Sequence, residues 1–277
     1  MRAWWREGGL RFGERPTPAL RAPDDVRVRV MLAGLCRTDV AVAQGRLACV
    51  EPCVLGHEVA GVVEAVGSDV TRFRVGERVA CLPQVDGRRL GIERDGGFAE
   101  AMVLPERALV AVPAGLDWRR AAFVEPVAAC LAVRRAPLQG VVRVVGEGRI
   151  AELTRRVLYA SGHADGPGPA DVVVETGGSD ASLRAALDEV RDGGTVVLKS
   201  RPSRALAFDV ADVVVRELRL FGVGWAPFDE AFALLNEGLP VEDLLGDVSP
   251  LEAFEDLLAV DETTKRFLAP EPARCAA

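Results

Sequence analysis

The hydrophobic pattern of this chain changes near Pro113, and the patterns on the two sides of that point require different architectures. Up to about Pro113, short apolar or β-branched stretches such as 26–30 and 59–66 are separated by glycines and prolines. That pattern is typical of a small antiparallel barrel or sandwich. Beyond it, strand-like apolar runs alternate with stretches of helical period, which predicts a mostly parallel sheet. The predicted fold class is therefore α/β, with a β-rich part followed by a βαβ part.

Length and charge limit the function classes that remain. The 277 residues suffice for two ordinary domains. The net charge of −7, without a basic cluster, argues against a nucleic-acid partner or an anionic membrane. The longest apolar stretch, 121–133, is too short and polar to span a membrane, and residues 1–9 lack the apolar core of a signal peptide. The sequence predicts a cytoplasmic protein whose six scattered cysteines are mostly free thiols.

A glycine-rich turn opens the first helix of the βαβ part. The apolar strand 141–145 ends at Gly146, and a helical pattern follows Gly148. The spacing Gly146-x-Gly148-x-x-Ala151, between a strand and a helix, is the context of a dinucleotide fingerprint that places a phosphate at the helix N-terminus. A Gly-x-Gly turn alone is a weak signal. The hypothesis is that Gly146, Gly148 and Ala151 contact a nucleotide cofactor.

Three short segments contain side chains that bind zinc in other proteins. Cys36 lies in 34–39, His57 and Glu58 lie in 52–58, and Glu125 precedes a proline. Thiolate, imidazole and carboxylate are the three ligand types that zinc uses, and a catalytic zinc keeps one position open. Each residue also has an ordinary interpretation: a buried small thiol, a hydrogen-bonded histidine, a carboxylate at a helix start. Their combination favours a metal centre.

These segments resemble, in this order, those of the zinc-containing medium-chain dehydrogenase/reductase family, which includes alcohol, polyol and threonine dehydrogenases. Further segments that resemble the family are 66–79, 97–100, 122–127 and 191–200. The resemblance covers most of the chain. It implies a GroES-like catalytic domain over 1–124, completed by 249–277, and a reduced Rossmann-like nucleotide-binding domain over 125–248.

The resemblance also implies a role for each candidate ligand. Cys36, His57 and Glu125 match the ligands of one catalytic zinc, and Glu58 lies beside or on the metal in this family. Asp39 matches the acid that orients the histidine ligand, a partner that such ligands normally need.

The same resemblance implies the reaction: a zinc-dependent oxidoreductase that moves a hydride between an alcohol or carbonyl substrate and NAD or NADP. Thr38 and Glu58 are then catalytic, with the Thr38 hydroxyl passing the substrate proton. Arg37 lies where some family members contact the cofactor pyrophosphate, and its alternative interpretation is a solvated arginine. The predicted partner is a small alcohol or carbonyl compound; a homodimer is one of the oligomeric states that the sequence leaves open.

The chain departs from the family pattern at two places. Between Val79 and Gly97 it offers only Cys81, so a second, structural zinc is not expected. After the fingerprint helix, the Gly/Pro-rich stretch 161–169 leads directly into a strand that resembles a later one of the family. The second strand, its helix and the third strand are therefore missing.

The missing strands also remove the usual acid that binds the adenosine ribose. Asp165 has nearly the expected spacing but lies in a Gly/Pro loop, and Glu175 corresponds to a different position of the family. Weak cofactor binding with poor discrimination between NAD and NADP is expected. An alternative function remains open: a non-catalytic family member that keeps the zinc site but has lost full dinucleotide binding.

Overall fold

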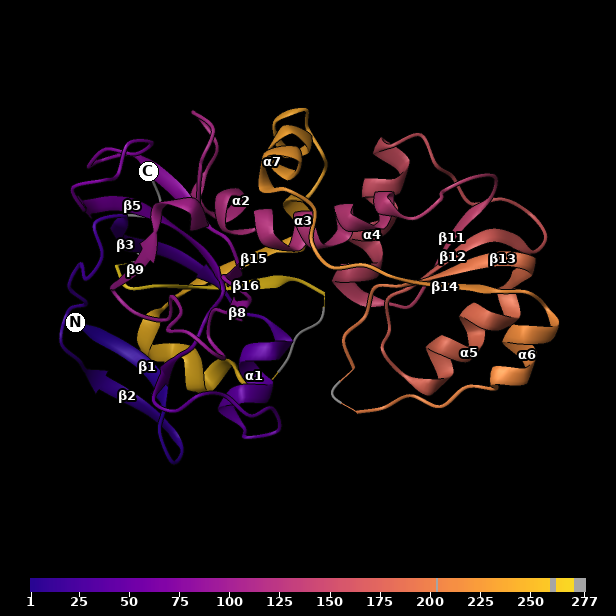
Figure 1. The fold of residues 1–277 in the computed structure, drawn as a ribbon, viewed down its shortest axis with the longest axis horizontal. Helices are drawn as coiled ribbons and strands as arrows, with labels where there is room; N and C mark the ends of the chain where they lie inside the picture. Colours follow the sequence, from indigo (N-terminus) through magenta and orange to yellow (C-terminus); the bar gives the residue numbers. More distant parts are fainter. Residues whose placement is uncertain (203, 260–262, 272–277) are drawn as a thin grey trace. The chain divides into compact units, whose positions relative to one another are not determined.

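The computed structural model describes residues 1–202, 204–259 and 263–271, and the chain separates into two compact units (Figure 1). Unit 1 contains Met1–Glu125 together with Val241–Ala277, and unit 2 contains Pro126–Pro240. The chain returns to unit 1 at Val241, earlier than the predicted residue 249, because β15 (Leu245–Pro250) pairs with β16 (Lys265–Ala269) there. No helix within the described ranges is long and apolar enough to cross a membrane.

Unit 1 is built around one large sheet with the strand order β10-β6-β5-β3-β16-β15, and β9 pairs with β3. Its other strands are β3 (Asp25–Gly34), β5 (Glu58–Val66), β6 (Arg78–Cys81), β9 (Ala101–Pro105) and β10 (Leu109–Ala111). Val26, Val28 and Val30 of β3 are buried, whereas the arginines between them are partly exposed. This alternation is the one expected of a strand with one face on the core.

The remaining elements of unit 1 are short. They are β1 (Arg2–Arg6), β2 (Leu10–Glu14), β4 (Cys53–Val54), β7 (Gln84–Val85), β8 (Arg88–Arg89), α1 (Arg37–Ala43), α2 (Trp118–Ala122), η1 (Glu106–Ala108), η3 (Glu242–Leu244) and η4 (Leu251–Leu257). α3 (Val124–Leu131) begins in unit 1 and continues into unit 2.

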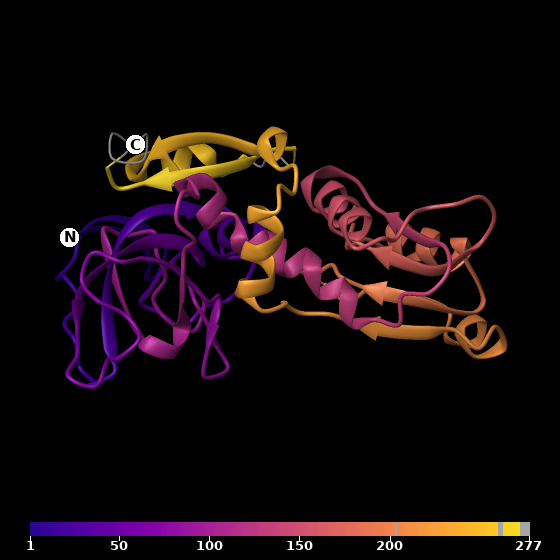
Figure 2. The same cartoon turned by 90° about the horizontal axis from the view of Figure 1, so that it is seen from above.

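The strand register of unit 1 places residues that are distant in the sequence next to one another in the sheet. Gly34, at the end of β3, lies opposite Glu58, at the start of β5, and also opposite Phe267 of β16. Figure 2 shows β15 and β16, drawn in yellow, as a neighbouring pair of strands. The C-terminal segment therefore lies next to the strand ends that carry the candidate ligands.

Unit 2 has a parallel sheet with the order β11-β12-β13-β14. The strands are β11 (Val142–Val145), β12 (Ala170–Glu175), β13 (Val190–Leu198) and β14 (Arg219–Gly222). The helices are η2 (Ala132–Arg135), α4 (Gly148–Ala160), α5 (Asp180–Glu189), α6 (Val210–Val215) and α7 (Phe228–Asn236). A complete dinucleotide-binding sheet has the order 3-2-1-4-5-6. Since the glycine turn follows β11, β11 is strand one, and the described residues contain no counterpart of strands two and three.

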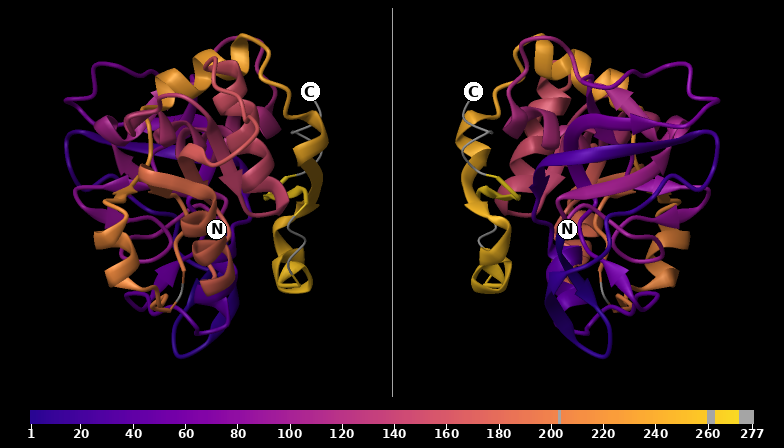
Figure 3. Two further views of the ribbon diagram at one scale, coloured as in Figure 1. Left: turned by 90° about the vertical axis from the view of Figure 1, so that its right-hand side faces the viewer. Right: turned by 90° about the vertical axis from the view of Figure 1, so that its left-hand side faces the viewer.

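Helices cover both faces of this sheet. Leu158 of α4 packs in one cluster with Val172 and Val174, whereas Leu183 of α5 packs with Val173 in another. Because successive strand residues point to opposite faces, α4 and α5 lie on opposite sides. α6 lies with α5 (Figures 1 and 3).

The loop 161–169 takes the place of the missing strands by passing around the outer edge of β11. The Ala164 carbonyl accepts a hydrogen bond from Val142 N, which points away from β12. The Arg143 side chain, on the α5 face, binds the Asp165 carboxylate at 2.9 Å and the Gly166 carbonyl at 2.6 Å. The chain thus leaves β11 on the α4 face and reaches β12 from the α5 face. A connection confined to the α4 face would have the opposite hand to β12–α5–β13, and almost all such crossovers are right-handed.

The exposed edge of β11 is closed by α4 as well as by the loop. Arg155 Nη2 donates to the carbonyl oxygens of Val144, at 3.3 Å, and Gly146, at 3.0 Å. Unpaired strand edges promote association with other chains, and charged side chains that cover them are a common protection. The outer edge of β11 is therefore covered in the shortened sheet.

Arg143→Ala is expected to release the loop 161–169, because the substitution removes the side chain that holds it against the sheet. The free energy of unfolding should fall by about 2 kcal/mol. Hydrogen exchange of the amides in 163–168 should also accelerate. Arg191→Ala is the control, since it removes a more exposed arginine–aspartate pair of the same unit and should leave this exchange unchanged. Equal exchange rates in the wild type and Arg143→Ala would contradict the loop's described path.

Candidate metal centre and nucleotide-binding turn

The structure brings Cys36, His57 and Glu58 together. The thiol sulfur, an imidazole nitrogen and a carboxylate oxygen all lie within 4.8 Å of one another. Cys36 directly precedes α1, whereas His57 and Glu58 lie at the start of β5. His57 and Glu58 are buried and Cys36 is half-buried. Three donors of the types that zinc prefers therefore converge in a largely enclosed place, and the donor set fits that metal.

Asp39, in the first turn of α1, links the two ligand segments. Its Oδ1 lies 3.2 Å from His57 Nδ1 and accepts a hydrogen bond from Gly56 N. Its Oδ2 accepts a hydrogen bond from Cys36 N at 2.9 Å. With Nδ1 engaged, Nε2 is the ring nitrogen that remains for a metal. Burial lowers the pKa of His57, but the charge and hydrogen bond of Asp39 and the neighbouring Cys36 outweigh burial and raise it well above its usual value.

Glu58 forms a buried ion pair with Lys265, a residue that the sequence analysis did not single out. Lys265 Nζ lies 2.6 Å from Glu58 Oε1 and 2.5 Å from Oε2, and it also donates to the Leu35 carbonyl. Each of the two residues is 1% exposed. Burial raises the pKa of Glu58, Lys265 opposes this effect, and Glu125 adds to it. The one signal in the sequence was that this arginine-rich chain has only two lysines, Lys199 and Lys265. The structure shows that both are buried.

Glu125 lies near this group without belonging to the three-residue cluster. It is buried in the first turn of α3, and its charge acts on Glu58. Thr38 is half-buried, with its hydroxyl oxygen 3.8 Å from Cys36 Sγ, and Arg37 is exposed in the same turn of α1.

The nucleotide-binding turn lies in unit 2, between β11 and α4. Gly146 has a φ of 126°, and a Cβ there would lie 2.3 Å from Thr176 Oγ1, so only glycine fits beside the end of β12. Gly148 begins α4 with a φ of 77°, and Ala151 is fully buried. The turn has the strand–glycine–helix form in which a phosphate binds at the helix N-terminus.

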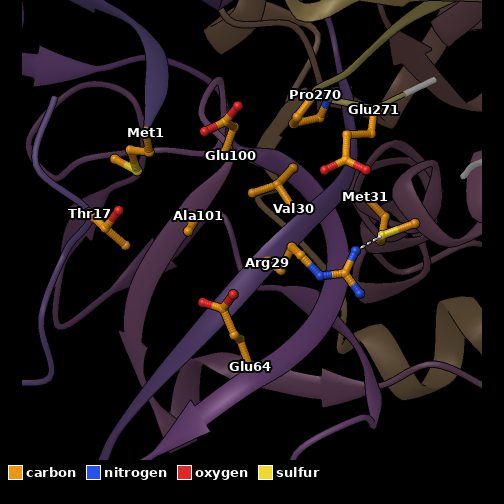
Figure 4. Close-up of a pocket in the computed structure, with 10 residues that line it drawn as sticks. All are labelled: Met1, Thr17, Arg29, Val30, Met31, Glu64, Glu100, Ala101, Pro270 and Glu271. Atoms are coloured by element: carbon orange, nitrogen blue, oxygen red, sulfur yellow. Dashed lines mark hydrogen bonds between the residues drawn. The ribbon is translucent and has the colours of Figure 1, made fainter. Parts of the chain in front are cut away.

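A separate hollow of about 240 Å³ lies on unit 1 (Figure 4). Its walls include Arg29, Glu64, Glu100 and Glu271. Glu100 is paired with Arg2, and Arg29 contacts the sulfur of Met31. None of the candidate metal ligands lines this hollow, so it is not part of the metal centre.

Comparison with known proteins agrees with this architecture. Residues 22–114 match the alcohol dehydrogenase GroES-like domain. The chain is 28% identical over 319 residues to probable D-xylulose reductase A of Aspergillus clavatus, covering 89% of this chain and 88% of that protein. It is 27% identical over 286 residues to sorbitol dehydrogenase 2 of Saccharomyces cerevisiae, covering 78% of this chain and 80% of that protein.

Solved structures share the fold. 2R,3R-butanediol dehydrogenase from Bacillus subtilis superposes with a TM-score of 0.85 at 23% identity, covering 98% of this chain and 99% of that chain. A zinc-binding dehydrogenase from Sinorhizobium meliloti 1021, solved with NADP, has a TM-score of 0.82 at 24% identity, covering 97% and 99%. The alignment with the xylulose reductase has 319 positions against 277 residues here, so at least 42 of its positions have no counterpart in this chain.

The purified protein is expected to contain about one zinc per chain, because its described residues offer one group of ligands. Cys36→Ala should abolish zinc retention, whereas Cys49→Ala and Cys53→Ala should not. Burial, with Asp95 nearby, raises the pKa of Cys53 to about 12, which disfavours the thiolate that a metal needs. Elemental analysis after dialysis measures the content. Two zincs per chain, none after supplementation, or equal loss from Cys53→Ala would contradict the assignment.

Lys265→Met is expected to lower the free energy of unfolding by about 3–5 kcal/mol, because it leaves the Glu58 carboxylate buried without its cation. The double variant Glu58→Gln/Lys265→Met should recover part of this loss, since the uncompensated charge is gone. Arg266→Met is the matched control. Arg266 is the next residue in the chain, and its side chain binds the Ala259 carbonyl at the surface. Chemical denaturation of the four proteins gives the values, and equal stability of Lys265→Met and Arg266→Met would refute the argument.

Proposed function

We infer that the chain is a member of the zinc-containing medium-chain dehydrogenase/reductase family, and from that premise we propose that it is a zinc-dependent oxidoreductase of alcohol or carbonyl substrates. The observation that carries the proposal is the convergence of Cys36, His57 and Glu58 around the carboxylate of Asp39. The relatives named as dehydrogenases and reductases favour this function over the non-catalytic alternative. Their names further suggest polyols or related secondary alcohols as the substrate class.

We propose Cys36, His57 and Glu125 as the zinc ligands, with Glu58 beside the metal. The short distances among Cys36, His57 and Glu58 support the position of the metal, and Glu125 is buried near enough for its charge to act on Glu58. Lys265 holds the Glu58 carboxylate, which leaves Cys36, His57 and Glu125 for a site with one open position. When bound, zinc supplies Lewis acidity that favours loss of the hydroxyl proton, and a nicotinamide accepts the hydride.

The chain's own residues orient the ligands, balance the charge of Glu58 and move the substrate proton. Asp39 fixes the ring of His57 and the backbone of Cys36, so the two ligand segments keep one geometry. Lys265 balances the charge of Glu58, which limits the negative charge that accumulates beside the substrate. Thr38, whose hydroxyl lies near Cys36 Sγ, takes the substrate proton at Oγ1 and releases its own proton to water.

For the cofactor, we propose NAD or NADP at Gly146, Gly148 and Ala151, with Arg37 on the pyrophosphate. The conformation of the glycine turn supports the first three residues. Arg37 is supported only by its exposure. A cytoplasmic location stays a prediction from the sequence, which leaves a homodimer open.

Zinc-loaded protein is expected to reduce NAD or NADP in the presence of sorbitol, xylitol or 2,3-butanediol, as measured by the absorbance of the reduced nicotinamide. A chelator should abolish turnover and zinc should restore it. Thr38→Ala should lower kcat by about 10²–10⁴-fold, because the proton loses its carrier, whereas Thr38→Ser should keep most of the activity. If fully zinc-loaded protein turned over no alcohol or carbonyl compound with either cofactor, the proposed function would be wrong.

A further inference from the structure

The described residues of unit 2 lack the part of the sheet that would hold an adenosine. A complete doubly wound sheet binds a dinucleotide at the point where its strand order reverses, with one mononucleotide-binding half on each side. The described strands of unit 2 run β11-β12-β13-β14 without a reversal. The loop 161–169 and the side chain of Arg155 cover the outer edge of β11. No strand or helix of the described residues provides a wall for the adenine.

Glu175, one of the two acids that the sequence offers for the adenosine ribose, is committed to the fold. It is 1% exposed at the end of β12. Its carboxylate accepts hydrogen bonds from Gly178 N at 2.7 Å, from Ser182 Oγ at 2.6 Å and from Ser200 Oγ. These bonds join the end of β12 to the start of α5 and to the residues after β13. A ribose would have to displace them.

Asp165, the second acid, is committed to the loop. Its Oδ1 accepts hydrogen bonds from Arg143 Nε at 2.9 Å and from Gly166 N at 2.8 Å. These are the contacts that hold the loop 161–169 around β11. Binding a ribose hydroxyl would therefore compete with the closure of the sheet edge. Neither acid fits the adenosine half of a dinucleotide.

The other half of the nucleotide site is retained. The turn at Gly146 and Gly148 opens α4, a helix of 13 residues whose N-terminus suits a phosphate. Lys199 follows β13 at the same carboxyl edge of the parallel sheet and is 6% exposed. Among the described residues its amino group has no hydrogen bond or ion pair. The Lys199 ammonium is not among the fully buried atoms, so at this edge of the sheet it suits an anionic ligand that approaches from solvent.

We propose that this chain binds its nicotinamide cofactor through the nicotinamide ribose phosphate alone, and that the adenosine moiety contributes no affinity. The proposal rests on the proposed hydride-transfer function, and it defines which part of the cofactor the protein recognises. Reduced nicotinamide mononucleotide then serves as well as NADH. A 2′-phosphate on the adenosine ribose has no effect, because the two acids that could recognise that ribose, Asp165 and Glu175, are engaged elsewhere.

The test is calorimetric titration of the zinc-loaded full chain with four probes: reduced nicotinamide riboside, reduced nicotinamide mononucleotide, NADH and NADPH. The last three are expected to have dissociation constants within about threefold of one another. The riboside, which lacks the phosphate, should bind about tenfold more weakly or worse. Asp165→Asn is the variant of choice because its side chain lies at the surface, and it should leave the ratio of NADH to mononucleotide affinity unchanged.

The outcomes separate the two proposals. NADH binding about thirtyfold or more tightly than the mononucleotide, or an NADH advantage that Asp165→Asn removes, would overturn the inference while the proposed function stands. If the riboside bound as tightly as the mononucleotide, the proposed phosphate site at the glycine turn would be wrong. If no probe bound to zinc-loaded protein, the hydride-transfer function itself would fail.

Discussion

A buried ion pair between Glu58 and Lys265 connects the two chain segments that form unit 1. Removing two charges from water is favourable only when each compensates the other, so the carboxylate of β5 depends on a lysine 207 positions further along the chain. Gly34 completes the arrangement, because a Cβ there would lie 2.2 Å from Glu58 Oε2. The C-terminal strand β16 therefore contributes to the candidate metal centre, and unit 1 needs both of its chain segments.

The sequence predicted the candidate ligands of the metal centre from local motifs. Cys36, Asp39 and His57 were assigned because their segments resemble those of the family, and the structure places them at the start of one helix and one strand. Lys265 was not predicted, because its role depends on the pairing of β16 with β3, which no local pattern encodes. The arginine excess was interpreted as a property of the whole chain, so the two lysines were not considered individually. Both of them are buried. The boundary at residue 249 was late for the same reason, since β15 belongs to unit 1 through a strand pairing.

The loss of two strands from unit 2 was visible in the sequence, because a Gly/Pro-rich stretch leads from a helix into a strand that resembles a later one. The sequence did not show how the remaining sheet accommodates this loss. That accommodation depends on Arg143 and Arg155, whose hydrogen bonds reach the loop and the outer carbonyl groups of β11. Arginine side chains in strand and helix patterns look the same whether they face solvent or cover an edge, so only the structure distinguishes the two.

The path of the loop 161–169 makes it a natural point for engineering the chain length. It leaves α4 on one face of the sheet, arrives at β12 from the other, and crosses the outer edge of β11 between them. A strand–helix–strand segment grafted into this loop would emerge beside that edge and could pair with it once Arg155 moved aside. The shortened domain thus retains the attachment point from which a six-stranded domain could be rebuilt, and surface loops of this kind tolerate insertion well.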